Sequence, residues 1–202
     1  MNNKLRFDLE DRPHPYPTMT GAELEKWGQI SISILTDDRN ILLLKTEWDL
    51  RVLIAWVMEN QEYFRNDVLL MNGEFLSQPQ ESLSQYVMRL QERVFLDEEE
   101  EAQAQWYRNL FEFHQHHNLH SSLHGSRIPG IIIGCNDGVG EISLVDTEDA
   151  RSHLYPDPED SEGDEEVYQS YLYTNEEDQW SYSFDMDDFL DDFQKYKGYL
   201  EL

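Results

Sequence analysis

The sequence predicts an α+β protein in which an antiparallel or mixed sheet, built from sequential hairpins, packs with about four helices on one side. The strand patterns follow one another in pairs joined by short polar turns, whereas a parallel sheet needs strands that alternate with helices. The 202 residues include 5 Trp, 11 Tyr and 9 Phe, which are enough apolar groups for a buried core. We therefore expect residues 1–202 to form a single domain.

Alternating apolar residues predict the first strands. Residues 5–9 alternate leucine and phenylalanine with charged residues, and residues 30–34 alternate isoleucine with serine. Between them, three prolines within residues 11–17 require an extended tether. A polar turn joins residues 30–34 to Ile41-Leu-Leu-Leu, which predicts a hairpin. Because residues 41–44 are apolar on both faces, we expect that strand to lie in the middle of its sheet.

An amphipathic helix is predicted to follow this hairpin. It opens at Glu47-Trp-Asp-Leu, with Asp49 near the positive end of the helix dipole, and its apolar spacing continues to about Phe64. Trp48, Trp56 and Phe64 recur every eight residues, so we expect them near one stripe of this helix.

Two more helices are predicted in the middle of the chain, after a turn at Asn72-Gly73. One begins near Pro79, and its apolar residues are Leu83, Tyr86, Val87, Leu90 and Val94. The other follows the acidic run at 97–101, which favours a helix N-terminus, and its apolar residues are Trp106, Tyr107, Leu110 and Phe111. Gly125 and then Pro129 indicate where this helix ends.

The last third of the chain predicts two further hairpins and a closing helix. The sequence predicts one hairpin from residues 131–135 and 141–145. It predicts a second one from residues 168–173 and 180–184, whose strands are joined by Asn175-Glu-Glu-Asp. Between the hairpins we expect a mobile acidic loop or insertion at 146–167, since residues 157–166 lack apolar anchors. The closing helix starts near Asp185, and its inward residues are Met186, Phe189, Leu190, Phe193 and Tyr196.

The charge of the chain restricts its partners. Fifteen Lys and Arg stand against 42 Asp and Glu, which gives a net charge of −27. Such a surface repels the phosphates of nucleic acids and anionic membranes, so we expect no direct nucleic-acid or membrane partner. It attracts basic proteins and accelerates encounter with them, although an acidic surface also serves solubility alone.

The cysteine content and the N-terminal residues indicate the compartment. Cys135 is the one cysteine, so no internal disulfide can form, which favours a reducing environment. The first residues contain no apolar run of signal-peptide length, and no segment is apolar for long enough to cross a membrane. We expect a cytoplasmic protein.

A histidine cluster is the sharpest local pattern. His114, His116, His117, His120 and His124 lie within eleven residues. If the segment is one helix, His116, His120 and His124 fall at i, i+4 and i+8, a spacing that allows two imidazoles to hold zinc, nickel or copper. The cluster matches no complete metal motif, so the simplest interpretation is an exposed polar helix end, and a pH-responsive surface is a second one.

Other candidate motifs for chemistry fail on their context. The segment Gly134-Cys-Asn-Asp-Gly-Val-Gly lacks a following lysine and helix, so it predicts a hairpin turn and not a phosphate loop. Cys135 follows an isoleucine run, which indicates a buried, unreactive thiol. In the acidic loop, a calcium-binding register would place Pro158 where an acid is required. We therefore expect no enzymatic activity, no cofactor and no specific metal site.

The acidic C-terminal region is the second strong feature. Residues 146–192 contain 18 acids and one base, a net charge of −17. Asp188 and Asp192 are four residues apart on the predicted helix, a spacing that costs a few tenths of a kcal/mol, roughly, in repulsion. Away from the helix N-terminus nothing in the sequence offsets this cost, so Asp191 and Asp192 indicate an outside, positively charged partner, and a solvated helix face is the alternative interpretation. The candidate docking residues are Asp185, Asp187, Asp188, Asp191, Asp192, Glu176, Glu177 and Asp178.

Two segments resemble the small acidic immunity proteins encoded beside bacterial toxins. They are the hairpin and helix from Ile30 to Asn60 and the closing Trp180-Ser-Tyr-Ser-Phe-Asp-Met-Asp-Asp-Phe. The resemblance implies a protein that binds and inhibits a basic toxin domain such as a nuclease. The acidic charge agrees with this function, because an acidic protein can block the basic groove in which a nuclease binds phosphates. Charge alone fits a DNA mimic that occupies a DNA-binding protein equally well, and a metal-dependent enzyme that uses the histidine cluster is a third hypothesis.

Overall fold

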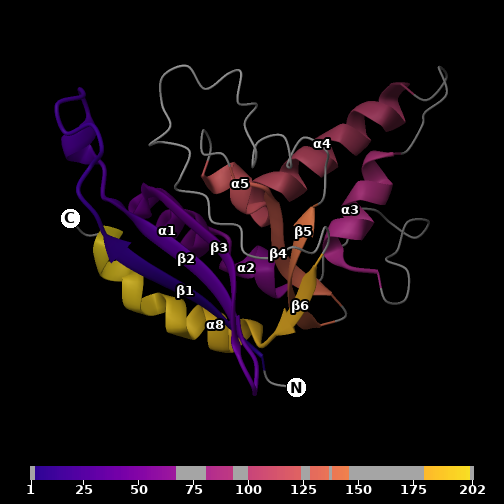
Figure 1. Ribbon diagram of the computed structural model, residues 1–202. Helices are drawn as coiled ribbons and strands as arrows, with labels where there is room; N and C mark the ends of the chain where they lie inside the picture. Colours follow the sequence, from indigo (N-terminus) through magenta and orange to yellow (C-terminus); the bar gives the residue numbers. More distant parts are fainter. Residues whose placement is uncertain are drawn as a thin grey trace, which may run out of the picture.

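The computed structural model describes residues 3–66, 81–92, 100–123, 128–136, 138–145 and 180–200. The protein has an α+β fold, as predicted, and its described strands are all paired antiparallel, in two three-stranded sheets (Figure 1). Several predicted features lie outside the described residues. They are the turn at 72–73, the helix start at Pro79, Val94, the acidic loop at 146–167, the strand at 168–173 and its following turn.

The first sheet has the order β1-β2-β3, and its strands are β1 (Lys4–Asp11), β2 (Trp27–Leu35) and β3 (Asn40–Asp49). The predicted hairpin is confirmed, but the prediction that residues 41–44 lie centrally is wrong because β2 is the central strand. The pairing shifts between Ile32 and Ser33, which face Leu44 and Leu42. This bulge places Leu43 and Leu44 both in the core, so an apolar run there does not require a central strand.

The hydroxyl of Tyr196 pairs with backbone groups of β1. It donates to the carbonyl of Phe7 at 2.8 Å and accepts from the amide of Leu9 at 3.3 Å. These two groups lie two residues apart on one strand, so the hydroxyl replaces the hydrogen bonds of a further strand. One buried side chain from the C-terminal segment therefore satisfies backbone groups of β1 that β2 leaves free.

The helix predicted from Glu47 to about Phe64 begins later than expected, because β3 continues to Asp49, and it is divided into α1 (Leu50–Glu59) and α2 (Gln61–Arg65). Asp49 caps α1 as expected, since its carboxylate accepts from the amide of Arg51 at 3.0 Å. The division falls at Asn60, whose side chain and backbone amide both donate to the carbonyl of Trp56, at 2.7 Å and 3.1 Å.

The predicted aromatic stripe is correct only in part. Trp56 and Phe64 contact each other with ring centroids 5.2 Å apart. Trp48 does not lie on the helix, because it belongs to β3 and packs on Trp27 of the neighbouring strand at 5.7 Å. The eight-residue spacing therefore does not continue across the junction between strand and helix.

The helix α3 (Leu83–Gln91) buries the predicted residues Leu83, Tyr86, Val87 and Leu90. Ser82 caps it in a reciprocal capping box with Gln85, so α3 begins at Leu83.

The next two helices are α4 (Glu100–His117) and α5 (Leu119–Ser122). The predicted face of α4 is partly wrong, since it buries Trp106, Leu110, Phe113 and His117, and exposes Tyr107 and Phe111. The buried residues recur at four, three and four positions, which follows one side of a helix. Asn118, which pairs with Ile132 of the second sheet, separates α4 from α5, so α4 ends before Gly125.

The second sheet has the order β4-β5-β6, and its strands are β4 (Gly130–Asn136), β5 (Val139–Val145) and β6 (Ser181–Phe184). The predicted hairpin of β4 and β5 is confirmed. The chain then forms α8 (Met186–Phe193) and the 3-10 helix η3 (Gln194–Leu200). The residues of this closing segment that were predicted to face inward are all buried; they are Met186, Phe189, Leu190, Phe193 and Tyr196.

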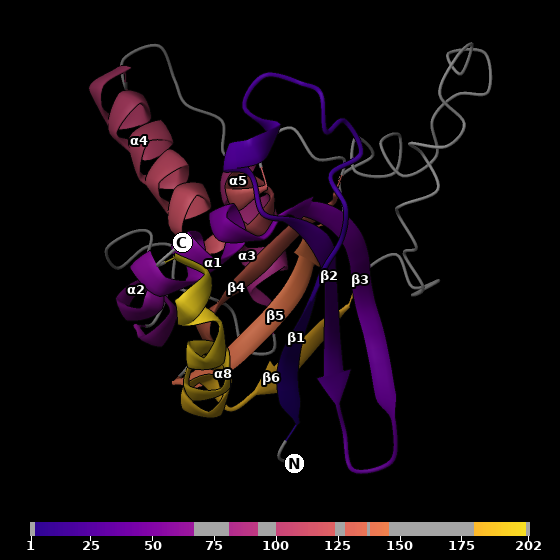
Figure 2. The same ribbon diagram turned by 90° about the vertical axis from the view of Figure 1, so that its left-hand side faces the viewer.

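The main core draws residues from both sheets. Ile131 and Ile133 of β4 contribute to it together with Phe7 of β1 and Phe189 of α8, and a smaller cluster packs Ile132 against α3 and α4. The second sheet is therefore covered on both faces. Figures 1 and 2 show α8 running beside β1, and they show α4 reaching outward from the body of the molecule.

Candidate functional site: the acidic surface of the last helix

The last helix presents the predicted docking acids on its outer side. Its apolar residues Met186, Phe189, Leu190 and Phe193 point into the core, while all five of its candidate aspartates are exposed. Asp185 begins the helix, and its carboxylate accepts from the amide of Asp188 at 3.0 Å. The structure thus brings Asp185, Asp187, Asp188, Asp191 and Asp192 together, whereas Glu176, Glu177 and Asp178 lie outside the described residues.

Three of these aspartates have basic partners within the protein. Asp187 accepts from Nε of Arg65 at 3.0 Å, Asp188 from Nζ of Lys4 at 2.8 Å, and Asp192 from Nζ of Lys195 at 2.8 Å. The hydrogen bond and the charge of Asp188 raise the pKa of Lys4. These pairs are exposed, so solvent screening leaves each of them only a small contribution to stability.

The basic partners differ in how readily the sequence indicates them. Lys195 lies three residues after Asp192, a spacing that can be read from the helix pattern. Lys4 and Arg65 reach α8 from distant parts of the chain, and no local pattern indicates those pairs. Asp192 therefore has an internal role as well, which the charge pattern alone did not indicate.

Asp191 differs from its neighbours. It is exposed on α8, and in the described part of the chain no basic group lies within ion-pair distance of it. Its carboxylate also lies past the first turn, where the helix dipole no longer favours an acid. Asp191 is therefore the residue of this surface that is most available to a positively charged partner.

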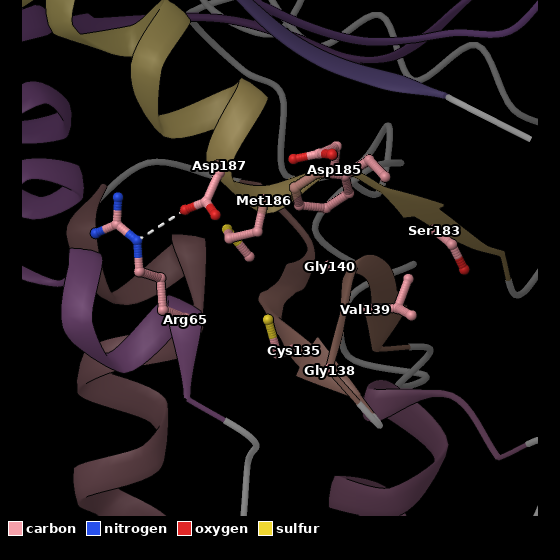
Figure 3. A pocket seen from close by; sticks show the side chains of 10 residues that line it. Arg65, Cys135, Gly138, Val139, Gly140, Ser183, Asp185, Met186 and Asp187 are labelled. Carbon is pink, nitrogen blue, oxygen red and sulfur yellow. Dashed lines mark hydrogen bonds and ion pairs between the residues drawn. The ribbon is translucent and has the colours of Figure 1, made fainter.

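A cavity of about 540 Å³ opens where α8 begins (Figure 3). Its lining consists of Arg65, Cys135, Gly138, Val139, Gly140, Ser183, Phe184, Asp185, Met186 and Asp187. The two aspartates favour a cationic group at this opening, and Arg65 already occupies that role at Asp187 (Figure 3). No local sequence pattern indicates this cavity, because the residues that line it come from three distant parts of the chain, at residue 65, residues 135–140 and residues 183–187.

The glycine-containing turn and Cys135 form the wall of this cavity as structural elements. The hairpin predicted for this turn is confirmed, with Gly138 at φ 74°, and the thiol of Cys135 is buried as expected. Gly140 allows close contact between β5 and β6, because a Cβ there would lie 2.8 Å from the carbonyl oxygen of Phe184.

The predicted face of His116, His120 and His124 does not form on one helix. α4 ends at His117, His120 is exposed on α5, and His124 lies outside the described residues. His116 contacts Asn60 at 2.6 Å and stacks on Tyr63 with ring centroids 3.6 Å apart. Among the described residues, no group of three or more potential ligands is arranged to hold a metal ion.

His117 is a core residue and not part of an exposed helix end. Its Nδ1 lies 2.8 Å from the carbonyl oxygen of Ile133, and its ring stacks on Phe113 at 4.7 Å. A carbonyl can only accept, so Nδ1 carries the proton. Burial lowers the pKa of His117 to about 4, although the hydrogen bond to Ile133 opposes this effect.

Comparison of the chain with protein-family models, with curated proteins and with solved structures finds no match. The resemblance to immunity proteins thus rests on two segments of the sequence, residues 30–60 and residues 180–189. In the part of the chain that the structure describes, no helix combines the length and the apolar character that a membrane crossing requires.

Proposed function

We propose that this chain is a non-enzymatic binding protein that inhibits a basic partner, in the manner of an immunity protein that neutralises a bacterial toxin such as a nuclease. The observation that carries the proposal is the set of five exposed aspartates on one short, well-packed helix. The net charge of −27 supports it, because such a field accelerates encounter with a basic surface.

The packing of α8 supports a preformed docking surface. Met186, Phe189 and Phe193 hold the helix in the core, and Lys4 and Arg65 fix two of its carboxylates. A surface that is ordered before binding loses less conformational entropy when the complex forms. The acids of α8 therefore suit a partner that is recognised quickly and without rearrangement of the helix.

A growth assay tests whether this chain inhibits a basic partner. The basic protein captured by this chain from its host is expressed alone and together with the chain. The proposal predicts that the captured protein alone stops growth and that co-expression restores it. Failure to capture any basic protein at low salt, or a complex that leaves the partner's activity unchanged, would contradict the proposed function.

Asp191 provides a sharper test of the surface. Asp191→Lys removes a carboxylate that has no described internal partner, so we expect the Kd for the captured protein to rise by about tenfold or more. The free energy of unfolding should change by less than about 0.5 kcal/mol. Glu92→Lys is the matched control, because Glu92 is an exposed acid that ends α3, away from α8. An equal loss of affinity in both variants would mean that overall charge acts and not the surface of α8.

A further inference from the structure

The cavity at the start of α8 is large enough to receive a side chain of another protein. Its volume of about 540 Å³ lies within the range of roughly 300–1,000 Å³ that is usual for ligand pockets. Figure 3 shows Arg65 of α2 on one side of it and Val139 of β5 on the other. Because distant parts of the chain form its wall, the cavity is a feature of the fold and not of one loop.

Part of the cavity wall is apolar. Val139 is 50% exposed at the start of β5, whereas Phe184 and Met186 are buried, and all three residues line the cavity. A long basic side chain suits such a wall, because its methylene stem can lie on apolar atoms while its charged head remains among polar groups.

The charged groups of the cavity favour a cation. Nε of Arg65 lies 3.0 Å from the carboxylate of Asp187, and Nη1 of Arg65 lies 3.9 Å from that of Glu62. Asp185 accepts from the amide of Asp188, and among the described residues no basic group lies within ion-pair distance of it. Two carboxylates and one guanidinium line the cavity, so its net charge is negative. Because Asp185 already caps α8, the helix start does not require an anion.

We infer that this cavity receives the side chain of one arginine or lysine of the basic partner. The methylene stem lies along Val139 and Met186, and the charged head faces Asp185. The inference rests on the proposed function and names the point at which the start of α8 contacts the partner. Basic side chains that enter a pocket, arginine above all, are common among the few residues that contribute most of the binding energy of an interface.

The first test titrates the full-length chain with N-acetyl-arginine amide and follows the backbone amide signals by NMR. N-acetyl-citrulline amide, which has nearly the same shape without the charge, is the matched probe. We expect the arginine probe to shift the signals of Val139 and Gly140 and to bind at least about threefold more tightly than the citrulline probe.

Asp185→Asn should weaken binding of the arginine probe at least about threefold, because asparagine keeps the helix cap and removes the charge. Asp38→Asn is the matched control, since it removes an exposed carboxylate in the turn between β2 and β3 that is not among the residues lining the cavity. We expect this control to bind the probe as the native chain does.

Arg65→Gln should have the opposite effect. The change removes the basic partner of Asp187 and with it the cation that competes with the probe. We expect the arginine probe to bind at least about threefold more tightly. Damage to the fold would weaken binding, so a tighter complex cannot result from it. Melting curves establish that each variant is folded.

Three results would overturn the inference. Equal binding of the arginine and citrulline probes would mean that charge plays no part in the cavity. Equal binding to the native chain and to Asp185→Asn, or an equal loss in Asp38→Asn, would mean that the charge of Asp185 has no local effect. Weaker binding to Arg65→Gln would mean that Arg65 itself holds the ligand, which a cation does not allow.

The inference and the proposed function fail separately. If the native chain and Asp185→Asn bind and inhibit the captured protein equally, the proposed function stands and the cavity contact is excluded. If Asp185→Asn weakens capture of a basic protein whose activity the chain leaves unchanged, the cavity contact stands and the inhibitory role is wrong.

Discussion

At the scale of single residues, His117 shows how the fold changes the chemistry of a motif. The sequence places it in a histidine cluster that suggests a metal or a pH-responsive surface. In the structure its ring stacks on Phe113, and its Nδ1 donates a hydrogen bond to the carbonyl of Ile133 in β4. A buried imidazole with one satisfied nitrogen is held neutral, because charging it without a counterion is costly. His117 therefore joins α4 to the second sheet.

The stability of the protein should depend on pH through His117. Its pKa falls from 6.5 to about 4 in the folded state, so the unfolded state binds the proton first as the pH decreases. Neutral His117 makes its full contribution to the free energy of unfolding above pH 6.5. As the pH falls toward 4, this free energy decreases by up to about 3 kcal/mol. Urea denaturation of the native chain and of His117→Asn across this pH range measures the loss. The asparagine amide nitrogen takes the place of Nδ1 and keeps a donor for Ile133 but does not titrate, so parallel pH profiles would contradict the interpretation.

At the scale of elements, the start of α3 depends on side chains from β5. The amide of Leu83 donates to Glu141 at 2.7 Å, and the amide of Ser84 donates to the hydroxyl of Ser143 at 3.1 Å. Ser82 supplies the acceptor for the next amide, so three amides that a helix start leaves free are all bonded. Glu141 and Ser143 thus align α3 with the second sheet.

Removal of the Glu141 carboxylate should destabilise this junction. Glu141 is 7% exposed, so Glu141→Ala leaves the amide of Leu83 without its acceptor in a buried place. We expect a loss of about 1–3 kcal/mol in the free energy of unfolding. Glu141→Gln keeps an oxygen acceptor and should lose less. Glu112→Ala, on the exposed side of α4, is the control for removal of a carboxylate, and an equal effect of all three changes would contradict the capping role.

The elements themselves were largely predictable, and their junctions were not. Alternation and helical spacing located the strands around Phe7, Ile32 and Ile142 and the helix around Phe189, because each signal is local. The break falls at Asn60, whose side chain adds a hydrogen bond to the carbonyl of Trp56, and the apolar spacing continues to Phe64 without indicating it. Two of the three basic partners of the α8 acids, Lys4 and Arg65, are distant in sequence, and only the tertiary fold brings them close.

At the scale of the whole molecule, the negative charge is divided between internal and outward roles. Pairs such as Lys4–Asp188 and Arg65–Asp187 neutralise part of the α8 surface, whereas Asp191 and the glutamates of α4 have no described basic partner. A net charge of −27 repels itself, so free carboxylates on two separate helices carry a cost in stability. Under the proposed function, attraction of a basic protein offsets that cost in the complex.

The salt dependence of association with the captured basic protein tests this account most directly. Raising sodium chloride from about 0.1 M to about 1 M shortens the screening length from about 10 Å to about 3 Å. If the acidic surface steers the partner, stopped-flow measurements should show an association rate constant that falls by about tenfold or more, with a smaller change in dissociation. An association rate that does not change over this range would contradict the account, because the charge of the chain would then play no part in recognition.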